Sequence, residues 1–471
     1  MKNIRTKFYS LKENQDRLDL KKKFYVPVSN SCIVFEENGL ITAGIDFEIT
    51  DRIIIERMLI DTDINGFIFK SLFSKLLFVN YLNKDILVKK DDFKKYKDYL
   101  FIFTYLEIDN YFLLKLTNYK RRRFVEVGSI KTGKLNNLCD VPGVKVGHFS
   151  INNQDTNTGI TAILPHERNI FKEKLIAASY VYNGFTKCIG LTQIDELGTL
   201  ETPILLTNTL NVGKVSEGLV DHVLEDNPEI GVSTSTVNPV VLECNDGTLN
   251  DIRNRHLDSN SVKKAIDAAN SDYLDGNIGA GSGMTCHGFK GGIGSASRVI
   301  KLDNKEYTLG ILVNSNFLGS TPKYLRINNH FIGDKFDRQQ DIADKGSITI
   351  VFATDIPLSE RQLKRILKRS VLGIGRTGGF AGNGSGDVVV GFSTANIIDH
   401  YNKNTFSNLV TLNDNSIDLV FRATVDATEE AILNSLFNSK TVVGVRGNKS
   451  QSINEFIEIF DHLLINSIFE D

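Results

Sequence analysis

Three short segments of the chain consist almost wholly of apolar and β-branched residues: 307–316, 348–354 and 387–393. Such runs are typical of strands whose two faces are both buried. A sheet built from them needs cover on each face, which a layered arrangement of helices and sheets provides. Helical and strand patterns alternate around these segments, so the sequence predicts an α/β or α+β layer protein.

Capping patterns indicate where two helices begin. Ser359 is followed three residues later by Gln362, as in a capping box, which predicts a helix start at this point. The apolar stripe of this helix is predicted to consist of Leu363, Ile366, Leu367 and Val371. A second helix is predicted to begin near Asp426, with Glu429 as its capping partner.

The composition changes near the basic run at residues 121–123. Only three of the 37 glycines, Gly39, Gly44 and Gly66, precede this run, in a chain of 471 residues that is long enough for two domains. We therefore predict a domain boundary near residue 125, with a small accessory or oligomerisation domain over residues 1–125 and a second domain over residues 126–471. The first domain carries no catalytic motif, and its role is not identified by the sequence; residues 111–116 alternate as a strand does.

Charge and cysteine usage exclude several classes of protein. The chain has 55 basic and 57 acidic residues, which argues against a phosphate-binding surface and hence against nucleic acid as a partner. Its five cysteines are scattered, which favours a reducing cytoplasm over a disulfide framework or a zinc site. The charged N-terminus and the short apolar runs predict a protein that is neither exported nor membrane-bound.

None of the candidate cofactor motifs has the neighbouring residues or secondary structure that such a motif requires. Residues 373–378 spell G-x-G-x-x-G, but they follow a predicted helix, whereas the dinucleotide fingerprint follows a strand. The glycine-rich segment 276–294 lacks a Walker lysine and is interpreted as closely packed backbone or a substrate-lining loop. The histidines show no metal-ligand spacing, and G-x-S-x-G is absent. We therefore expect neither a metal nor an organic cofactor.

Ser347 is the candidate nucleophile. It stands between Gly346 and a buried strand, and a serine in that position is often only the first residue of the strand. If the Gly346–Ser347 bond is cut, however, Ser347 carries a free α-amine that can act as base for its own hydroxyl. Such an amine has a pKa of about 7.7–8.0, close to working pH. Gly346 suits a scissile position because it tolerates strained backbone.

Further polar residues lie at the ends of the other predicted strands. The loop 382–387 opens onto a buried strand and places Ser385 and Asp387 at its start. Asn316 closes the strand 307–316 and offers an amide donor suited to an oxyanion. Each of these residues also has an alternative reading as ordinary turn chemistry.

From about residue 130 onward the chain resembles the DmpA/BapA family of L-aminopeptidase/D-amino-acid esterases and β-peptidyl aminopeptidases. The matching motifs are 140–148 (DVPGVKVGH), 155–165 (DTNTGITAILP), 201–209 (ETPILLTNT), 250–253 (NDIR), 288–298 (GFKGGIGSASR), 346–358 (GSITIVFATDIPL) and 382–396 (GNGSGDVVVGFSTAN). The resemblance implies a four-layer αββα sandwich, like that of DmpA and the ornithine acetyltransferases. The N-terminal 125 residues are an addition to that pattern.

The resemblance also implies self-cleavage into residues 1–346 and 347–471, which stay associated and form a homo-oligomer. Ser347 resembles the nucleophile, Ser385 and Asp387 the pair that orients it, and Asn316 the oxyanion donor. Glu243 resembles the carboxylate that holds the free amine of the substrate. The family places an oxyanion-assisting tyrosine close to this glutamate, whereas this chain has Cys244 and Asn245, so Asn245 is the substitute donor.

The sequence therefore predicts an N-terminal-serine aminopeptidase or amidase that acts on small peptides, amides or esters with a free amine. Three alternatives stay open. The first is an amidase on non-peptide oligomers such as linear aminohexanoates, and the second is an acyl transferase that uses the same acyl-enzyme. The third is an unprocessed binding protein, against which the intact Gly346, Ser347, Ser385 and Asp387 set argues.

Overall fold

The chain divides into two compact units, Arg122–Ile459 and Met1–Arg121 with Phe460–Asp471. The computed structural model describes residues 127–336 and 346–456, together with seven strands nearer the N-terminus. These strands form one sheet in the order β1-β2-β3-β4-β5-β7-β6. Their bounds are β1 Ile4–Ser10, β2 Ser31–Glu37, β3 Leu40–Ile49, β4 Ile53–Ile60, β5 Ile86–Lys89, β6 Phe103–Ile108 and β7 Tyr111–Leu116. The strand predicted over residues 111–116 is confirmed as β7.

The larger unit contains a six-stranded sheet in the order β11-β10-β21-β20-β17-β16. Its strands are β11 Thr199–Leu200, β10 Glu173–Gly184, β21 Gly386–Asp399, β20 Ser347–Thr354, β17 Lys305–Asn316 and β16 Gly292–Leu302. Neighbouring strands are antiparallel except β20 and β21, which are parallel. The three predicted apolar strands are confirmed: they are β17, β20 and β21, although β21 continues well beyond the predicted end.

A four-stranded sheet, in the order β13-β12-β9-β8, packs against one face of the six-stranded sheet. Its strands are β13 Val240–Cys244, β12 Ile204–Asn208, β9 Asn157–Leu164 and β8 Lys145–Asn152. Side chains alternate between its two faces, as the period of two in a strand requires. Leu206 and Leu242 face the other sheet, where they meet Val351 and Val390, whereas Leu205 faces the helices.

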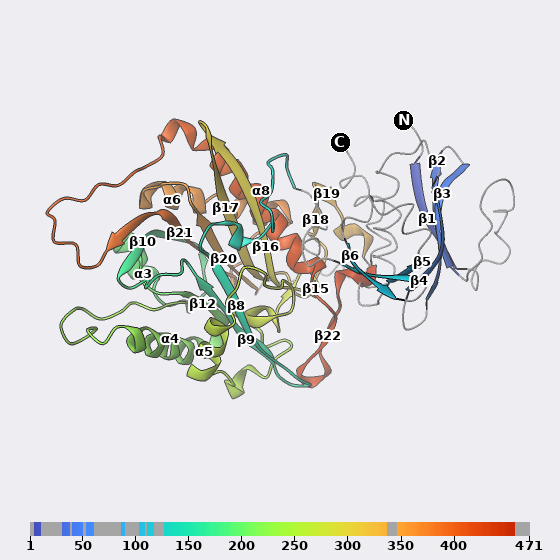
Figure 1. Cartoon of the computed structure of the whole chain (residues 1–471). Helices are drawn as coiled ribbons and strands as arrows, with labels where there is room; N and C mark the ends of the chain where they lie inside the picture. The colour runs from blue at the N-terminus through green and yellow to red at the C-terminus, as the bar shows by residue number, and fades with distance from the viewer. Residues whose placement is uncertain are drawn as a thin grey trace. The chain divides into compact units, whose positions relative to one another are not determined.

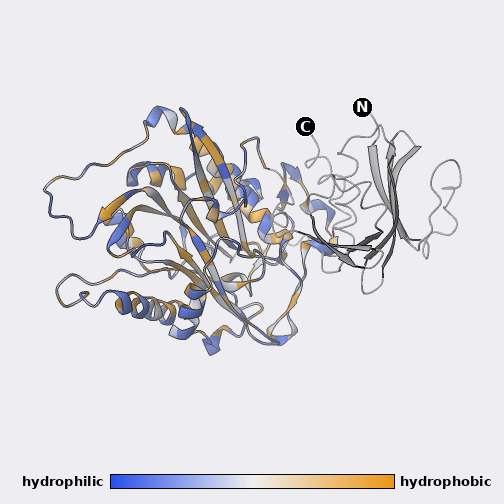
Figure 2. Cartoon of the chain, viewed as in Figure 1, coloured by the Kyte–Doolittle hydropathy of each residue, from blue (hydrophilic) through white to orange (hydrophobic). Residues whose placement is uncertain are grey.

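Helices cover the outer face of each sheet (Figure 1). The four-stranded sheet is covered by α4 (Val212–Asp226) and α5 (Ser259–Asp267). The six-stranded sheet is covered by α6 (Glu360–Leu367) and α8 (Asp418–Phe437), and α7 (Ser370–Arg376) packs on α8. The short helix α3 (Leu191–Leu197) contacts β10. Figure 2 shows mainly hydrophilic residues on α4 and α5, over strands that carry many hydrophobic ones.

These layers confirm the predicted αββα sandwich. Short two-stranded ribbons join its elements: β14 Thr285–Cys286 with β15 Phe289–Lys290, β18 Arg326–Ile327 with β19 His330–Phe331, and β22 Val442–Val443 with β23 Lys449–Ser450. Within the described part of the chain, no helix combines the length and the apolar character that a membrane span requires.

The helix predicted from the capping box is confirmed, with Ser359 as N-cap and Gln362 closing the box. Its predicted stripe ends earlier, because Val371 belongs to the separate helix α7. The rejection of a dinucleotide motif at residues 373–378 agrees with the fold, since Gly373 lies within α7. A Cβ at Gly373 would lie 2.6 Å from the Cβ of Thr428, so this glycine allows α7 to approach α8.

The predicted helix start near Asp426 is wrong. Asp426 lies in the middle of α8, which begins at Asp418. Asp426 and Glu429 are three residues apart, a spacing that resembles a capping box, but on α8 it places both carboxylates on one face. There they form ion pairs with Arg376 of α7, at 2.7 and 3.3 Å.

A buried ion pair joins α8 to β16. Arg298 Nη2 lies 2.7 Å from Glu430 Oε2, and both side chains are almost completely buried. Arg298 Nη2 also donates to the Val127 carbonyl at 2.7 Å, and Asn136 Nδ2 donates to Glu430 Oε1 at 2.5 Å. The pair therefore connects residues before position 346 with residues after position 347.

Replacement of Arg298 by Met should lower the free energy of unfolding by about 3–5 kcal/mol, because it leaves the Glu430 carboxylate buried without its cationic partner. The measurement is urea unfolding monitored by circular dichroism. The matched control is Lys131→Met, which breaks the exposed Lys131–Glu306 pair at 3.6 Å and should change stability by less than about 1 kcal/mol. Equal effects of the two substitutions would contradict a structural role for the buried pair.

Candidate active site

One row of paired residues crosses four strands at one end of the six-stranded sheet. Gly184 of β10 pairs with Gly386 of β21, Gly386 pairs with Ser347 of β20, and Ser347 pairs with Asn316 of β17. Gly386 and Ser347 begin their strands, while Asn316 and Gly184 end theirs. The strand pairing therefore brings together residues that are far apart in the sequence.

Ser347 and the residue before it share one hydrogen-bond donor. The Gly386 N–H donates to Ser347 Oγ at 3.3 Å and to the Gly346 carbonyl oxygen at 3.2 Å. A Cβ on Gly346 would lie 2.3 Å from the Asn316 carbonyl oxygen and from Phe317 Cα. The φ angle of Gly346 lies outside the left-handed region, so this position requires glycine for space and not for an unusual backbone conformation.

Ser385 and Asp387 flank Gly386 on β21 and the preceding loop. Ser385 Oγ donates to Asp387 Oδ1 at 2.7 Å, and both residues are buried. The loop is attached to β10, because Asn183 Nδ2 donates to the carbonyl oxygens of Gly382 and Ser385 at 2.9 and 2.5 Å. The predicted pair thus forms a rigid hydrogen-bonded unit beside Gly386.

Asn316 is held in one orientation by two hydrogen bonds. Its Oδ1 accepts from the Thr285 N–H, and its Nδ2 donates to the Asn245 carbonyl oxygen, each at 2.9 Å. A primary amide has two N–H donors, so one remains for another acceptor. Asn316 is also the register partner of Ser347.

Glu243 lies near the end of β13 and is almost fully buried. Its Oε1 accepts from the Lys187 N–H at 3.0 Å and from Thr186 Oγ1 at 3.2 Å, and its Oε2 accepts from the Thr209 hydroxyl. Thr186 also lies against Gly386, because a Cβ on that glycine would approach the Thr186 Cβ to 3.1 Å. This carboxylate is therefore attached to the loop that follows β10, beside the row that contains Ser347.

Asn245 contacts Asn316 through its backbone. Its carbonyl oxygen accepts from Asn316 Nδ2, while its exposed side chain accepts from the Gly247 N–H at 2.9 Å. The neighbouring Cys244 is buried between the sheets, and its Sγ donates to the Asn314 carbonyl oxygen at 3.5 Å. Burial raises the pKa of the Cys244 thiol, so this cysteine packs as a neutral side chain.

Buried polar groups support the segments behind the site. Asp246 accepts from Thr158 Oγ1 at 2.6 Å and from Asn250 Nδ2 at 2.9 Å. Lys290 Nζ donates to the carbonyl oxygens of Gly281, Met284 and Gly291 at 2.8 to 2.9 Å. Burial raises the pKa of Asp246 and lowers that of Lys290. These bonds fix the chain next to Asn245 and on both sides of Thr285.

The glycine-rich segment 276–294 is closely packed backbone, one of its two predicted interpretations. A Cβ on Gly291 would lie 2.4 Å from the Ser315 carbonyl oxygen, and one on Gly294 would lie 2.0 Å from the Ala431 carbonyl oxygen. The first contact brings β15 and β16 against β17, and the second brings β16 against α8.

Sequence reasoning did not identify Thr186, Lys187, Thr209 or Thr285. Thr186 and Thr209 contact Glu243 through their hydroxyls, and Lys187 and Thr285 act through backbone N–H groups. Backbone donors carry no signal in the sequence. Thr209 is the last residue of the matching motif 201–209, and this was the one indication in the sequence that it belongs to the site.

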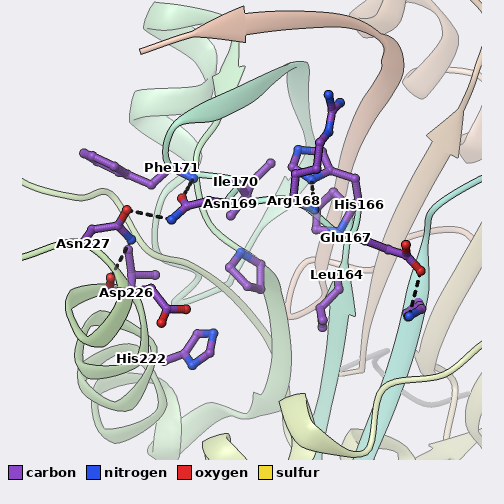
Figure 3. Close-up of a pocket in the computed structure, with 14 residues that line it drawn as sticks. Leu164, His166, Glu167, Arg168, Asn169, Ile170, Phe171, His222, Asp226 and Asn227 are labelled. Carbon is purple, nitrogen blue, oxygen red and sulfur yellow. Dashed lines mark hydrogen bonds and ion pairs between the residues drawn. The ribbon is translucent and has the colours of Figure 1, made fainter. Parts of the chain in front are cut away.

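A separate cavity of about 250 Å³ lies at the other end of the four-stranded sheet (Figure 3). It adjoins Leu164, which follows Ile163, and Ile163 pairs with Ile204 at the start of β12. Glu243 lies toward the other end of the sheet, where it pairs with Thr207 near the end of β12. Its lining includes the ion pair of Lys145 with Glu167 at 2.8 Å. None of the predicted site residues lines it.

Within the described residues, no group of three or more His, Cys, Asp or Glu side chains is arranged to hold a metal ion.

The site thus gathers Ser347, at the start of a buried strand, with Asn316 and the residues around Gly386. Residues 136–450 match the family model "Peptidase family S58". The chain therefore belongs to peptidase family S58, and it is a hydrolase of the serine aminopeptidase class.

Comparison with curated proteins gives two β-peptidyl aminopeptidases named BapA. The one from Sphingosinicella microcystinivorans is 36% identical over 350 residues, which cover 69% of this chain and 86% of the relative. The one from Sphingosinicella xenopeptidilytica is 35% identical over 346 residues, which cover 68% of this chain and 85% of the relative.

Solved structures show the same fold. The PH0078 protein from Pyrococcus horikoshii OT3 is 46% identical with a TM-score of 0.68, and the match covers 72% of this chain and 97% of that protein. The L-aminopeptidase D-Ala-esterase/amidase from Ochrobactrum anthropi is 31% identical with a TM-score of 0.67, covering 73% of this chain and 99% of that protein. The latter is described as a variant of the Ntn hydrolase fold.

A buried histidine also packs behind the site. His287 is fully buried, and its ring meets the ring of Phe317 edge to face at a centroid distance of 4.9 Å. Neither ring nitrogen forms a hydrogen bond with the described residues. Burial lowers the pKa of His287 to about 3, so the folded protein holds the neutral imidazole at ordinary pH.

The contribution of His287 to stability should decrease as the pH falls below about 6.5, because the unfolded chain then protonates His287 and the folded chain does not. Between pH 7.5 and 5.0 this difference amounts to about 2 kcal/mol. Urea unfolding at both pH values measures it. In the His287→Asn variant, which tolerates the positive φ at this position and does not titrate, the loss should be about 2 kcal/mol smaller. An unchanged pH dependence in the variant would contradict this account.

Proposed function

We propose that the chain cuts its own Gly346–Ser347 bond and then acts as an N-terminal-serine aminopeptidase or amidase. The observation that carries this proposal is the shared Gly386 N–H, which contacts both the hydroxyl of Ser347 and the carbonyl of the preceding residue. The nucleophile and the bond to be cut are thereby held in one place before cleavage.

In self-cleavage, Ser347 Oγ attacks the Gly346 carbonyl carbon, and the acyl group moves from nitrogen to oxygen. Water then hydrolyses the ester, which leaves a carboxylate on Gly346 and a free α-amine on Ser347. The fragments 1–346 and 347–471 stay together, because β20 lies between β17 and β21 and the Arg298–Glu430 pair joins the two fragments.

In the mature enzyme, the α-amine of Ser347 removes the proton from Oγ, which attacks the substrate carbonyl. The free N–H of Asn316 stabilises the oxyanion that forms. The Ser385–Asp387 hydrogen bond orients the polar groups beside the nucleophile. Water then releases the acyl group, and no residue in this sequence of steps requires a metal or an organic cofactor.

Glu243 selects substrates that carry a free amine. A carboxylate accepts about four hydrogen bonds, and three are used by Thr186, Lys187 and Thr209, so one remains for an ammonium group. The substrate class is therefore small peptides, amides or esters with a free amino terminus. The names of the relatives extend this class to N-terminal β-residues and to D-alanyl esters and amides.

The roles of the other regions are part of the same proposal. Residues 126–471 form the catalytic domain, in keeping with the family match at 136–450, and residues 1–125 form an accessory domain. The enzyme works in the cytoplasm, which suits the cysteines at positions 139, 188, 244 and 286, since none of these described cysteines forms a disulfide bond. It forms a homo-oligomer, which sedimentation velocity would detect.

Substitution of Ser347 by Ala should abolish self-cleavage, because no hydroxyl remains to attack Gly346. On a denaturing gel the wild type should give two fragments, and the variant should give one intact chain. The control is Ser370→Ala on α7, which removes a buried hydroxyl that has no hydrogen-bond partner among the described residues and should leave cleavage unchanged. Cleavage in Ser347→Ala, or an uncut wild type, would overturn the proposed mechanism.

Substitution of Glu243 by Gln should lower kcat/KM for substrates with a free amine by about 10–100-fold, since a hydrogen bond to a charged group contributes about 1.5–3 kcal/mol. The rate for an amino-blocked amide should change little. A matched control is Glu196→Gln on α3, an exposed carboxylate with no hydrogen bond to the site. If Glu243→Gln still discriminates free from blocked amines as the wild type does, Glu243 does not hold the ammonium group.

A further inference from the structure

The backbone N–H of Gly386 contacts two reacting atoms of the proposed self-cleavage. It lies 3.2 Å from the oxygen of the carbonyl under attack and 3.3 Å from the oxygen that attacks it. The first contact begins the parallel ladder between β20 and β21, in which Ser347 pairs with Gly386. The scissile carbonyl is therefore an acceptor in the sheet before any chemistry takes place.

We propose that the Gly386 N–H is the oxyanion donor of self-cleavage, a role separate from that of Asn316 toward substrates. This inference rests on the proposed self-cleavage. As Ser347 Oγ bonds to the Gly346 carbonyl carbon, the carbonyl π electrons move onto the Gly346 oxygen, where the Gly386 N–H already points. A donor that is in place before the charge develops needs no reorganisation during the reaction.

The remaining bond changes need one water molecule and no other reactant. When the tetrahedral intermediate collapses, the carbon–nitrogen bond before Ser347 breaks and the proton of Oγ ends on the departing nitrogen. One water molecule then cleaves the ester, adding its oxygen to the Gly346 carbonyl carbon and returning a proton to Oγ.

Asn316 is poorly suited to this first reaction. Its Oδ1 and one of its Nδ2 protons are used by Thr285 and Asn245, and neither of these two hydrogen bonds reaches the Gly346 carbonyl oxygen. Its backbone carbonyl instead lies against the Gly346 Cα region, where a Cβ would approach it to 2.3 Å. Two successive reactions at one serine therefore use two different donors.

The position of this N–H also explains why residue 386 is a glycine. A side chain on residue 386 would meet the loop after β10, since a Cβ there would lie 2.6 Å from the Phe185 carbonyl oxygen. That loop is attached through the Phe185 N–H to the Ser385 carbonyl oxygen at 3.3 Å. A bulkier residue would displace the N–H from the Gly346 oxygen.

The test removes this N–H without adding an atom to the side chain. Glycolic acid is incorporated in place of Gly386 by in-vitro translation, which replaces the N–H by an ester oxygen, and intact chain is followed over time on a denaturing gel. Self-cleavage should slow by about 10²–10³-fold, as on loss of a single oxyanion donor. The matched control is α-hydroxyisovaleric acid in place of Val388, the next residue of β21 on the same face, which should slow cleavage by less than about tenfold.

The outcomes separate this inference from the proposal on which it rests. An uncut wild type overturns self-cleavage itself. A cut wild type with equal cleavage rates in the two esters overturns only the role of Gly386. If the Gly386 ester does not fold, a crystal structure of the uncut Ser347→Ala protein decides the question. A Gly386 nitrogen outside hydrogen-bonding distance of the Gly346 oxygen would then overturn the inference.

Discussion

The parallel pairing of β20 with β21 is the constraint on which the site depends. It places Ser347 opposite Gly386, and the antiparallel neighbours β17 and β10 extend the row to Asn316 and Gly184. A shift of one residue in this register would turn Ser347 to the opposite face of the sheet and separate the Gly346 carbonyl from the Gly386 N–H. The chemistry proposed for Ser347 therefore depends on how two buried strands align.

That alignment is maintained by packing on both faces of the sheet. The inner face contributes Leu312, Val351 and Val390 to a core shared with the four-stranded sheet, and the outer face is covered by α6 and α8. Because β20 has a partner on each side, the proposed cut of the bond before it would free an amine without freeing the strand. In the proposed mechanism, the same packing positions the precursor for cleavage and keeps the two fragments together.

Much of this architecture follows from local sequence patterns. Apolar runs predicted β17, β20 and β21, and polar residues at their ends predicted that Asn316, Ser347, Ser385 and Asp387 would meet. The predicted helix start near Asp426 was wrong for a specific reason. Asp426 and Glu429 are three residues apart because both form ion pairs with Arg376, and not because a helix begins there. The contacts of Glu243 with the loop after β10 depend on tertiary pairing, which no single segment encodes. The contact of Asn245 with Asn316 uses a backbone carbonyl, which any residue would supply.

The most direct test of Ser347 as an N-terminal nucleophile is to trap its acyl-enzyme. The purified protein is mixed with a slowly hydrolysed aminoacyl ester and quenched in acid, and intact and tandem mass spectrometry locate the added acyl group. The account predicts a fragment of residues 347–471 that carries one acyl group on Ser347. An acyl group on any other residue, or on an uncut chain, would contradict it.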